Sequence, residues 1–554
     1  MKGFMRMKLV LNFTAVAIIA ASVAVSLSSS IAYAHTASAP VTAVYVGVHT
    51  TGVLISTTSP SLAKRRVASN QHRTDFSPLP DSTPYAGVKV NDSSLVQGFA
   101  AEGSLRQNFN GLSDADSAAV NGVNVSPPDQ GLCVGIDPGV PRKVVFEIVN
   151  EVVRETAPDG SDLPGTPLLR NQDFTLDRFF NDPNADSDPR CFYDWSTGSF
   201  YFTVISTPNG NSFFFDVAVF NAKGFHVYQF NDSFGGLYEG DQPHVGYDRN
   251  NLYVSTDEKS SGPGPGAALF AISKSQLIAE GTTPSMVTLG PLRLGGQKVG
   301  GLQPAVSTTS TGTEYLLNSF RQRLNRQMGL WTVHNDTNVT TSGRVTLTGT
   351  LIQSEAYVDP VPALSTGSGK TTNGITSEAA LHVGGARMEQ VEFIDGHLWA
   401  ALHTAVHVNG DPVTRDGIAW FEVNPVRARV TSQGYIASRR QYLIYPAIMR
   451  TSEGTTAIVF TATSPNLNPS AAYVVCKSDT RQFGEVSIAA RGTKPHISNA
   501  ETDQGNPHWG DYSAATLDPN GRDIWLATEY IPPLPNQNSL DNWGTRVFDI
   551  KGDQ

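Results

Sequence analysis

The chain has 554 residues, of which 16% are charged and 40% are hydrophobic, with 50 glycines, 34 prolines and a formal net charge of −10. This composition is typical of a turn-rich, all-β globular protein, and its apolar runs are short, alternating and rich in Val, Tyr, Phe and Thr. An acidic chain without a basic stripe is a poor partner for nucleic acid, so that class of partner is excluded.

Residues 1–34 have the pattern of a signal peptide. A positively charged start is followed by an apolar stretch from Leu9 to Leu27 and by the small-x-small triplet Ala32–Ala34, where a signal peptidase would cut. We therefore expect a secreted chain, either extracellular or periplasmic. The alternative is a chain anchored by its uncleaved N-terminal segment. No other segment of the sequence is long and apolar enough to span a bilayer.

Residues 35–106 are rich in Ser, Thr, Ala and Pro, with one apolar patch from Val41 to Ile55. Such a composition is typical of a flexible spacer, and the patch allows a local hairpin. We expect the folded body to occupy residues 107–554.

A short sequence motif then recurs along the rest of the chain. It consists of a short polar segment, an apolar strand, a turn that contains Asp or Gly, and an aromatic-rich second strand. The copies are Pro127–Val149, Asp188–Val204, Asp241–Thr256, Leu302–Ser319, Ala386–Leu402, Tyr445–Ala462 and Trp509–Tyr530. They begin about 54 to 83 residues apart, which leaves room for two more strands between copies. A hairpin repeated at this interval predicts an all-β, seven-bladed β-propeller, with six or eight blades as the alternatives.

Two further expectations follow from a ring of blades. The ring must close, so the alternating stretch Trp543–Phe548 is expected to pair with residues in the range 107–122. The second strand of each repeat carries a large aromatic residue that we expect to be packed between neighbouring blades. These residues are Tyr201, Tyr253, Tyr315, Trp399, Phe460 and Trp525.

The chain has three cysteines, and two of them, Cys133 and Cys191, fall at nearly equivalent places in the first two repeats. Equivalent positions in adjacent blades favour a disulfide if the Cα atoms come within about 5.5 Å, and buried free thiols are the alternative.

Two sets of residues are candidates for binding. Asp182, Asn184, Asp186 and Asp188 place oxygen atoms at alternate positions, as a calcium loop does, so Ca²⁺ is the one cofactor that the sequence indicates. An Asx-rich turn is the alternative.

The second set stands just before the first strand of each repeat, where propeller strands meet at one mouth of the axial channel. Its members are Asp129, Asp188, Asp241, Gln303, Arg387, Tyr445 and Asp511. Four like charges at one axis would repel each other unless a cation, an arginine or a ligand offsets them. The alternative is that these residues are there as turn formers.

The phrases PPD…VG, DP…YD, YP.I and WGDYSA, in this order, resemble a group of secreted bacterial β-propeller proteins of unassigned activity, over roughly residues 107–548. The architecture is also distantly similar to that of sialidases. The resemblance implies export and a propeller, and it implies no substrate.

Together these observations predict an exported, monomeric propeller that binds or scaffolds a cell-envelope or extracellular polymer, a glycan or a protein, at the axial mouth. An exo-acting glycoside hydrolase or lyase on the same fold is the alternative. The sequence names no catalytic residue.

Overall fold

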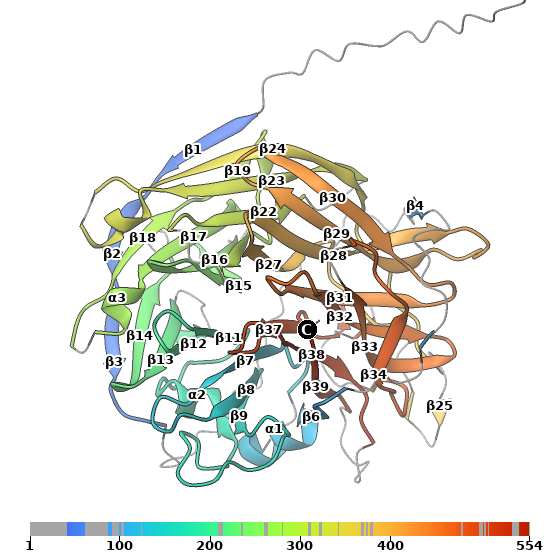
Figure 1. The fold of residues 1–554 in the computed structure, drawn as a ribbon, viewed down its shortest axis with the longest axis horizontal. Coiled ribbons are helices and arrows are strands. Elements are labelled where there is room, and N and C mark those ends of the chain that lie inside the picture. The colour runs from blue at the N-terminus through green and yellow to red at the C-terminus, as the bar shows by residue number, and fades with distance from the viewer. Residues whose placement is uncertain are drawn as a thin grey trace, which may run out of the picture. The chain divides into compact units, whose positions relative to one another are not determined.

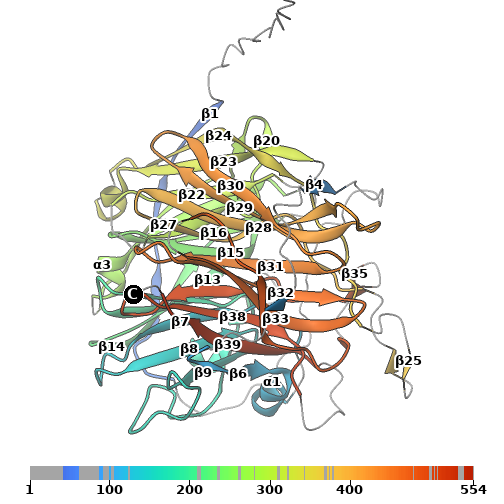
Figure 2. The ribbon, with the colours of Figure 1, turned by 45° about the vertical axis from the view of Figure 1, so that its right-hand side comes forward.

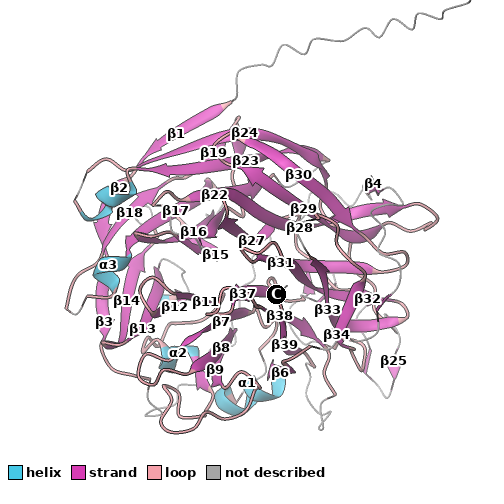
Figure 3. Ribbon diagram, viewed as in Figure 1, coloured by secondary structure: helices cyan, strands magenta, loops and turns pink. Residues whose placement is uncertain are grey.

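In the computed structural model, the described residues are 41–60, 87–90, 99–100 and, with short gaps, 105–552. Most of them lie in β-strands (Figure 3). The helices among them are short: α1 (Asp114–Asn121), α2 (Leu176–Phe179), α3 (Lys274–Leu277) and the 3-10 helix η3 (Asp336–Thr340). The described fold is therefore all-β, as the composition predicts.

The described strands form seven antiparallel groups of four, called units 1 to 7 here. Units 1 to 4 are β7–β10 (Gly131–Ile136, Lys143–Val149, Val152–Thr156, Phe174–Thr175), β11–β14 (Arg190–Asp194, Ser199–Ser206, Phe214–Asn221, Gly224–Asn231), β15–β18 (Glu239–Tyr247, Asn251–Lys259, Gly266–Ser273, Ser285–Leu289) and β21–β24 (Gln303–Ser307, Tyr315–Ser319, Asn325–His334, Thr346–Tyr357). Units 5 to 7 are β27–β30 (Met388–Ile394, His397–Val408, Arg415–Asn424, Arg429–Ile436), β31–β34 (Tyr442–Arg450, Thr456–Ser464, Leu467–Cys476, Val486–Ala490) and β37–β39 with β6 (Ala514–Leu517, Ile524–Tyr530, Gly544–Ile550, Asn108–Ser113). Short two-stranded ribbons lie outside the units: β19 with β20 (Arg293–Leu294, Gln297–Lys298), β25 with β26 (Thr371–Thr372, Ile375–Thr376) and β35 with β36 (Thr502–Asp503, Asn506–Pro507).

The units are arranged around a central axis, with their first strands innermost. Figure 1 shows β7, β11, β15, β27, β31 and β37 around the centre and the later strands of each unit farther out. Neighbouring first strands even pair over a few residues, β15 with β21 and β21 with β27, both in parallel. Four-stranded antiparallel sheets around an axis are the arrangement of a β-propeller.

The core lies between adjacent units rather than at the axis. Each of the large apolar clusters draws on two neighbours; for example, Phe146 of unit 1 packs with Phe200 and Phe202 of unit 2, with ring centroids 5.0 and 5.2 Å apart. Alternation along each strand produces this pattern, because one face of a sheet meets the preceding unit and the other face meets the next.

The predicted aromatic residues mostly lie in these interfaces. Tyr201, Tyr253 and Trp399 are each the third residue of their strand and are buried, and Trp525 is the second residue of its strand and is also buried. Tyr315 differs, because it opens β22 and is only partly buried. Phe460 is buried but lies farther along its strand, at the fifth residue of β32. The expectation of matching positions is therefore confirmed for part of the set.

The ring closes between the two ends of the folded body, as the sequence predicts. Strand β39 pairs antiparallel with β38 on one side and with β6 on the other, so Val547 lies opposite Phe109. Figure 1 and Figure 2 both show β6 beside β39. The last unit is thus completed by a strand that precedes the first unit in sequence.

The segment 41–56 is not a free spacer with a local hairpin. It forms three strands, β1 (Thr42–Val46), β2 (Val48–Thr51) and β3 (Val53–Ser56), which pair antiparallel with β24, β18 and β14. Figure 1 shows them in blue along the rim. Their alternating residues suit an outer edge strand, and each one extends a different unit because no tight turn joins them. The spacer interpretation therefore does not hold for these residues.

Two shorter strands from the same region also join the body. Strand β4 (Val88–Val90) pairs in parallel with β28, and β5 (Phe99–Ala100) pairs in parallel with β34. The predicted signal peptide, residues 1–34, lies outside the described residues. Within the described part, no helix is long and apolar enough to cross a membrane.

Cys133 and Cys191 form a disulfide that joins β7 of unit 1 to β11 of unit 2, with a Cα–Cα distance of 5.5 Å. Cys476 is buried and free. The first strands of adjacent units are thus close enough at this level to be bridged.

We expect Cys133→Ala/Cys191→Ala to lower the free energy of unfolding by about 4 kcal/mol, because the bridge closes a loop of 58 residues in the unfolded chain. Thermal and urea unfolding of the double variant would measure the loss. Cys476→Ser is the matched control and should cost less. Equal stability of wild type and double variant would contradict the expectation.

Candidate functional site

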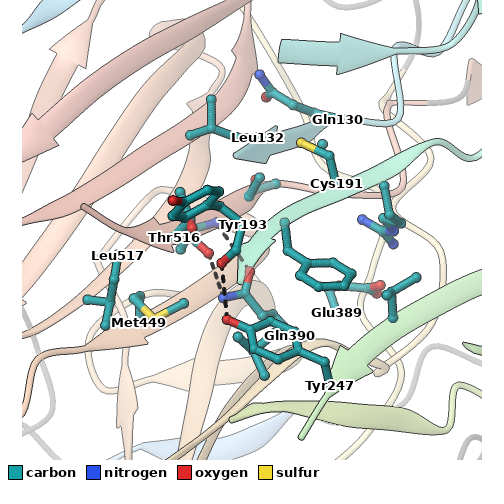
Figure 4. A pocket seen from close by; sticks show the side chains of 18 of the residues that line it. Gln130, Leu132, Cys191, Tyr193, Tyr247, Glu389, Gln390, Met449, Thr516 and Leu517 are labelled. Carbon is teal, nitrogen blue, oxygen red and sulfur yellow. Dashed lines mark hydrogen bonds between the residues drawn. The ribbon is translucent and has the colours of Figure 1, made fainter. Parts of the chain in front are cut away.

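A channel runs along the axis between the first strands. Its cavity volume is about 70 Å³, and it is lined by residues from β7, β11, β15, β21, β27, β31 and β37. One end lies where these strands begin, near Gln130, Arg190 and Gln303, and the other lies at the hairpin turns, near Trp195 and Leu517. Figure 4 shows the lining side chains converging on the channel.

The strand-start end carries a set of buried polar residues, called the axial cluster here. Its members are Asp129, Asp188, Arg190, Gln242, His244, Arg387, Tyr445, Asp511 and Tyr512. All of them except Arg190 are buried, and Arg190 is intermediate.

The backbone is unusual at four of these residues. Asp129, Asp188, Gln242 and Tyr445 have φ values of +44°, +53°, +50° and +53°, in the left-handed region that residues other than glycine rarely adopt. Asp129 and Asp188 stand two residues before the first residues of β7 and β11, and Gln242 and Tyr445 lie within bulges of β15 and β31. Such strain persists only where the surroundings impose it, and it concentrates at functional sites.

Asn150 links Asp129 and Asp188. Its side-chain amide donates to Asp129 Oδ2 at 2.6 Å, and its oxygen accepts from the backbone N–H of Asp188 at 2.9 Å. Because Asn150 follows β8 and is fully buried, it links the start of unit 1 to the start of unit 2.

Asp511 bonds three other members of the axial cluster. Its backbone N–H donates to Asp129 Oδ1 at 2.7 Å, and its carboxylate accepts from Gln242 Nε2 at 3.1 Å and from the Tyr445 hydroxyl at 3.4 Å. Units 1, 3, 6 and 7 therefore meet at this one residue.

His403 holds Tyr445 in place. Its Nδ1 accepts from the Tyr445 N–H at 2.9 Å, and its Nε2 donates to the carbonyl oxygen of Gly385 at 2.8 Å. These two bonds assign the Nε2–H tautomer.

At one position of the predicted set, the structure places the neighbouring residue in the cluster instead. Asp241 is partly exposed, and its carboxylate pairs with Lys259 at 2.7 Å. Its neighbour Gln242 reaches Asp511 instead. Gln242 precedes Pro243 as Asp188 precedes Pro189, so it is the true equivalent; the choice of Asp241 was one position off. Gln303 is buried and donates to the carbonyl oxygens of Val245 and Pro304.

Two arginines face the carboxylates. The Arg190 guanidinium lies 3.2 Å from the centroid of the Tyr512 ring, and the His244 ring meets the same tyrosine edge-on at 6.0 Å. Arg387 lies close to Asp511, and its charge opposes the rise in the pKa of that carboxyl that burial and Asp129 cause. The cluster thus combines both signs of charge in a buried place.

The charges shift the pKa values of the acids. Burial raises the pKa of Asp188 well above its usual value, and the charges of Asp129, Asp241 and Asp511 raise it further. Burial and Asp129 likewise raise the pKa of Asp511. A raised pKa favours the protonated carboxyl group, which can donate as well as accept hydrogen bonds.

His244 is affected in the opposite direction. Burial lowers its pKa well below the usual value, and the charges of Arg190 and Arg387 lower it further. The ring is therefore neutral, with one nitrogen that donates and one that accepts.

Several buried polar atoms of this region have no hydrogen-bond partner among the described residues. They are both ring nitrogens of His244, Nε of Arg387, Nη2 of Arg190, the hydroxyl of Tyr512 and the side-chain oxygens Oε1 of Gln130 and Gln303. More than nine in ten buried polar groups are normally bonded, so each of these atoms keeps an unmet hydrogen-bonding capacity.

The predicted calcium loop is organised differently. Asp182 accepts from Ser206 Oγ at 2.6 Å and from Gln229 Nε2 at 3.0 Å, while the side chain of Asn184 donates to Asp182 at 3.1 Å. Asp186 accepts from Thr207, and Asp188 belongs to the axial cluster. Within the described ranges, no group of three His, Cys, Asp or Glu side chains is arranged to hold a metal ion. Calcium binding stays a prediction.

Sequence reasoning missed His244, Glu389 and Tyr512, and it left Arg190 out of the residues chosen for the axial mouth. Alternation along a strand does not reveal these residues, because Asp188 lies before β11 and a bulge interrupts the register of β15 between Asp241 and His244.

Buried acids away from the cluster make stability depend on pH. Burial raises the pKa values of Glu155 and Asp248 to about 7, of Glu258 and Glu355 to about 8 and of Glu151 to about 9. Because these pKa values exceed those of the unfolded chain, the folded state holds more protons, and the stability that this provides is lost as the pH rises through about 7 to 9.

We therefore expect a lower melting temperature at about pH 9 than at about pH 6. Glu355→Gln should reduce this difference, since burial alone raises the pKa of Glu355. Differential scanning calorimetry at both pH values provides the measurement. A melting temperature that rises with pH over this range would contradict the expectation.

Comparisons with known proteins identify no family. No family model matches the chain, and no curated protein matches it. Among solved structures, a subtype N10 neuraminidase-like protein of A/little yellow-shouldered bat/Guatemala is 9% identical, with a TM-score of 0.34, over 67% of this chain and 99% of that one.

Two other solved structures are similar to the same degree. The α-L-arabinanase of Penicillium chrysogenum, complexed with arabinobiose, is 8% identical, with a TM-score of 0.32, over 80% of this chain and 98% of that one. A Hadza microbial sialidase is 12% identical, with a TM-score of 0.34, over 74% of this chain and 73% of that one. At these values the similarity assigns no activity to this chain.

Proposed function

We propose that this chain is an exported, seven-bladed β-propeller that binds a polyhydroxylated ligand, such as a glycan of the cell envelope or the extracellular space, at its axial cluster. Units 1 to 7 are the blades in this proposal. The observation that carries it is the set of unpartnered buried donors and acceptors on His244, Arg387, Arg190 and Tyr512, of which Arg190 lines the axial channel.

The mixture of groups favours hydroxyl groups as the ligand chemistry. A hydroxyl both donates and accepts, and the cluster offers both: guanidinium N–H donors, a neutral histidine ring and protonatable carboxyls. A phosphate or another strong anion fits less well, because Asp129, Asp188 and Asp511 oppose Arg190 and Arg387.

The channel provides the approach to the cluster. Arg190 is the member of the cluster that lines it, beside Gln303 and Glu389, so a ligand at the strand-start end meets Arg190 first.

Export rests on the N-terminal pattern of the sequence, and the Cys133–Cys191 bridge is in keeping with it, since disulfides persist in oxidising compartments. The partner in this proposal is a cell-envelope or extracellular polymer, bound by a monomeric chain.

The test is a glycan array and a cell-wall pull-down with the chain from residue 35 to 554, followed by titration of any hit. We expect Asp511→Asn and Tyr445→Phe to weaken binding roughly tenfold or more, because each removes a partner inside a buried network. Asp159→Asn is the matched control, since Asp159 lies in an exposed turn. The proposal fails if no glycan binds or if Asp511→Asn binds as tightly as wild type.

A second candidate function is hydrolysis of glycosides. The raised pKa values of Asp188 and Asp511 favour it, because a glycosidase needs one protonated carboxyl group as its general acid, beside a second carboxylate. Release of 4-nitrophenol from a panel of aryl glycosides would detect it. Activity that Asp511→Asn abolishes while binding persists would establish the enzyme, and no release from any glycoside would leave the binding function alone.

A further inference from the structure

Asp232 and Glu258 are two buried carboxyl groups at the boundary between units 2 and 3. Asp232 directly follows β14 of unit 2, and Glu258 lies near the end of β16 of unit 3. The two residues are 2% and 4% exposed. Acidic residues are almost never buried this deeply unless they are paired, so the groups that surround these two carboxyls decide what they can bind.

The register of unit 3 brings the two carboxyl groups to one face of its sheet. Gly240 pairs directly with Glu258, so the Cβ position of Gly240 lies on the same face as the Glu258 side chain, about 5 Å from its Cβ atom. Asp232 fills the space that a side chain at 240 would take, because a Cβ atom added to Gly240 would lie 2.3 Å from Asp232 Oδ2. This face also carries Val254, which packs in one cluster with Phe230 of unit 2. Asp232 therefore reaches across from unit 2 to the surroundings of Glu258.

Each carboxyl group keeps one buried oxygen without a hydrogen-bond partner among the described residues. These atoms are Oδ1 of Asp232 and Oε2 of Glu258. The other oxygen of Glu258 accepts from the Thr256 hydroxyl at 2.6 Å. Thr256 stands two residues before Glu258 on the same strand and hence on the same face. Two carboxyl groups and a hydroxyl oxygen thus gather over one part of the sheet.

The charges that act on this pair are negative. Burial raises the pKa of Asp232 well above its usual value, and the charges of Glu258 and Glu239 raise it further. Burial likewise raises the pKa of Glu258 to about 8, and the charge of Asp257 acts in the same direction. Lys259 follows Glu258 but belongs to the other face, where it pairs with Asp241 at 2.7 Å. Within the described residues, no lysine or arginine forms an ion pair with either carboxyl group.

We propose that Asp232 and Glu258 bind a divalent cation that joins unit 2 to unit 3. Buried carboxylate oxygens without a donor are the ligands that hard cations such as Ca²⁺ and Mg²⁺ prefer, and a cation would offset the negative charge gathered there. Because the site has two carboxylates, the Thr256 oxygen, backbone carbonyls or water must complete the coordination. The inference goes beyond the proposed function, since none of these residues belongs to the axial cluster, and it uses other residues than the loop 182–188.

The test is calorimetric titration of the chain from residue 35 to 554 with CaCl₂ and, separately, with MgCl₂, after treatment with EDTA. The titrations are run at about pH 8, because the pKa of Glu258 is about 8 and a cation binds the ionised carboxylate. We expect one saturable site with a dissociation constant of about 10⁻³ M or lower, the range of extracellular calcium sites. The ion that binds more tightly is the preferred cation.

Asp232→Asn and Glu258→Gln should each weaken this binding roughly tenfold or more, because they keep the shape of the side chain and remove its charge. Asp159→Asn is the matched control, since Asp159 lies in an exposed turn, and it should bind the cation as wild type does. Asp182→Asn is a second control, because it alters the loop 182–188 and leaves Asp232 and Glu258 intact.

Thermal melts separate a cation site from a merely structural role. Without added cation, Asp232→Asn should melt at or above the wild-type temperature, because it removes a buried charge that lacks a partner. With the cation in excess, wild type should gain stability and Asp232→Asn should not.

No binding of either ion, or equal affinity in wild type and both variants, overturns the inference. Loss of binding in Asp182→Asn with retention in Asp232→Asn also overturns it and assigns the ion to the loop 182–188. Wild-type stability that falls with rising pH and ignores both ions would show that the two carboxyl groups are held by protons instead. If one of the two variants does not fold, the other decides.

Discussion

Removal of residues 541–554 is expected to abolish cooperative folding of the body. The deletion takes away β39, which lies between β38 and β6, so unit 7 loses its third strand and β6 loses its partner. It also removes Trp543, Val547 and Phe548, all fully buried, and the hydroxyl of Thr545 that bonds Glu147 of unit 1. The exposed edges of β38 and β6 would then invite aggregation.

Circular dichroism, thermal unfolding and size-exclusion chromatography measure this outcome. A shorter truncation that ends after Gly552 keeps β39 whole and is the matched control. We expect the control to be soluble with a wild-type melting temperature. A soluble 1–540 chain with a sharp, wild-type transition would show that closure by β39 does not hold the ring together.

Trp525→Ala is expected to lower the free energy of unfolding by about 3–5 kcal/mol, the usual cost of truncating a buried aromatic residue. Trp525 is fully buried and packs with Leu132, Val134 and Val145 of unit 1, so it belongs to the interface where the ring closes. Its Nε1 also donates to Asp518 Oδ2 at 2.9 Å, and the variant would leave part of that carboxylate's bonding unmet.

Urea unfolding with linear extrapolation gives the size of this loss. Trp195→Ala is the matched control, because the same side chain is removed from a position that is 44% exposed, and it should cost less. If the two variants lost equal stability, Trp525 would have no special part in the contact between units 7 and 1.

Much of the fold is predictable from local pattern. About twenty consecutive residues contain the whole pattern of a hairpin: an alternating strand, a tight turn and a second strand. Each repeated segment therefore falls on the first two strands of one unit. Closure was also predictable, since a ring must cover its last edge. The strands that residues 41–56 contribute to three separate units were not, because edge pairing depends on which outer strands lie free in the folded ring.

The candidate site shows the same division. The sequence by itself determined that one polar residue recurs before each inner strand, and Asp129, Asp188, Arg387, Tyr445 and Asp511 do converge on the axis. Only the tertiary structure decided which neighbour in unit 3 points inward, Gln242 rather than Asp241, because a shift of one residue turns a side chain to the other face. The burial that shifts the pKa values of the acids and leaves the nitrogens of His244 without partners likewise arises only when distant units meet at one axis.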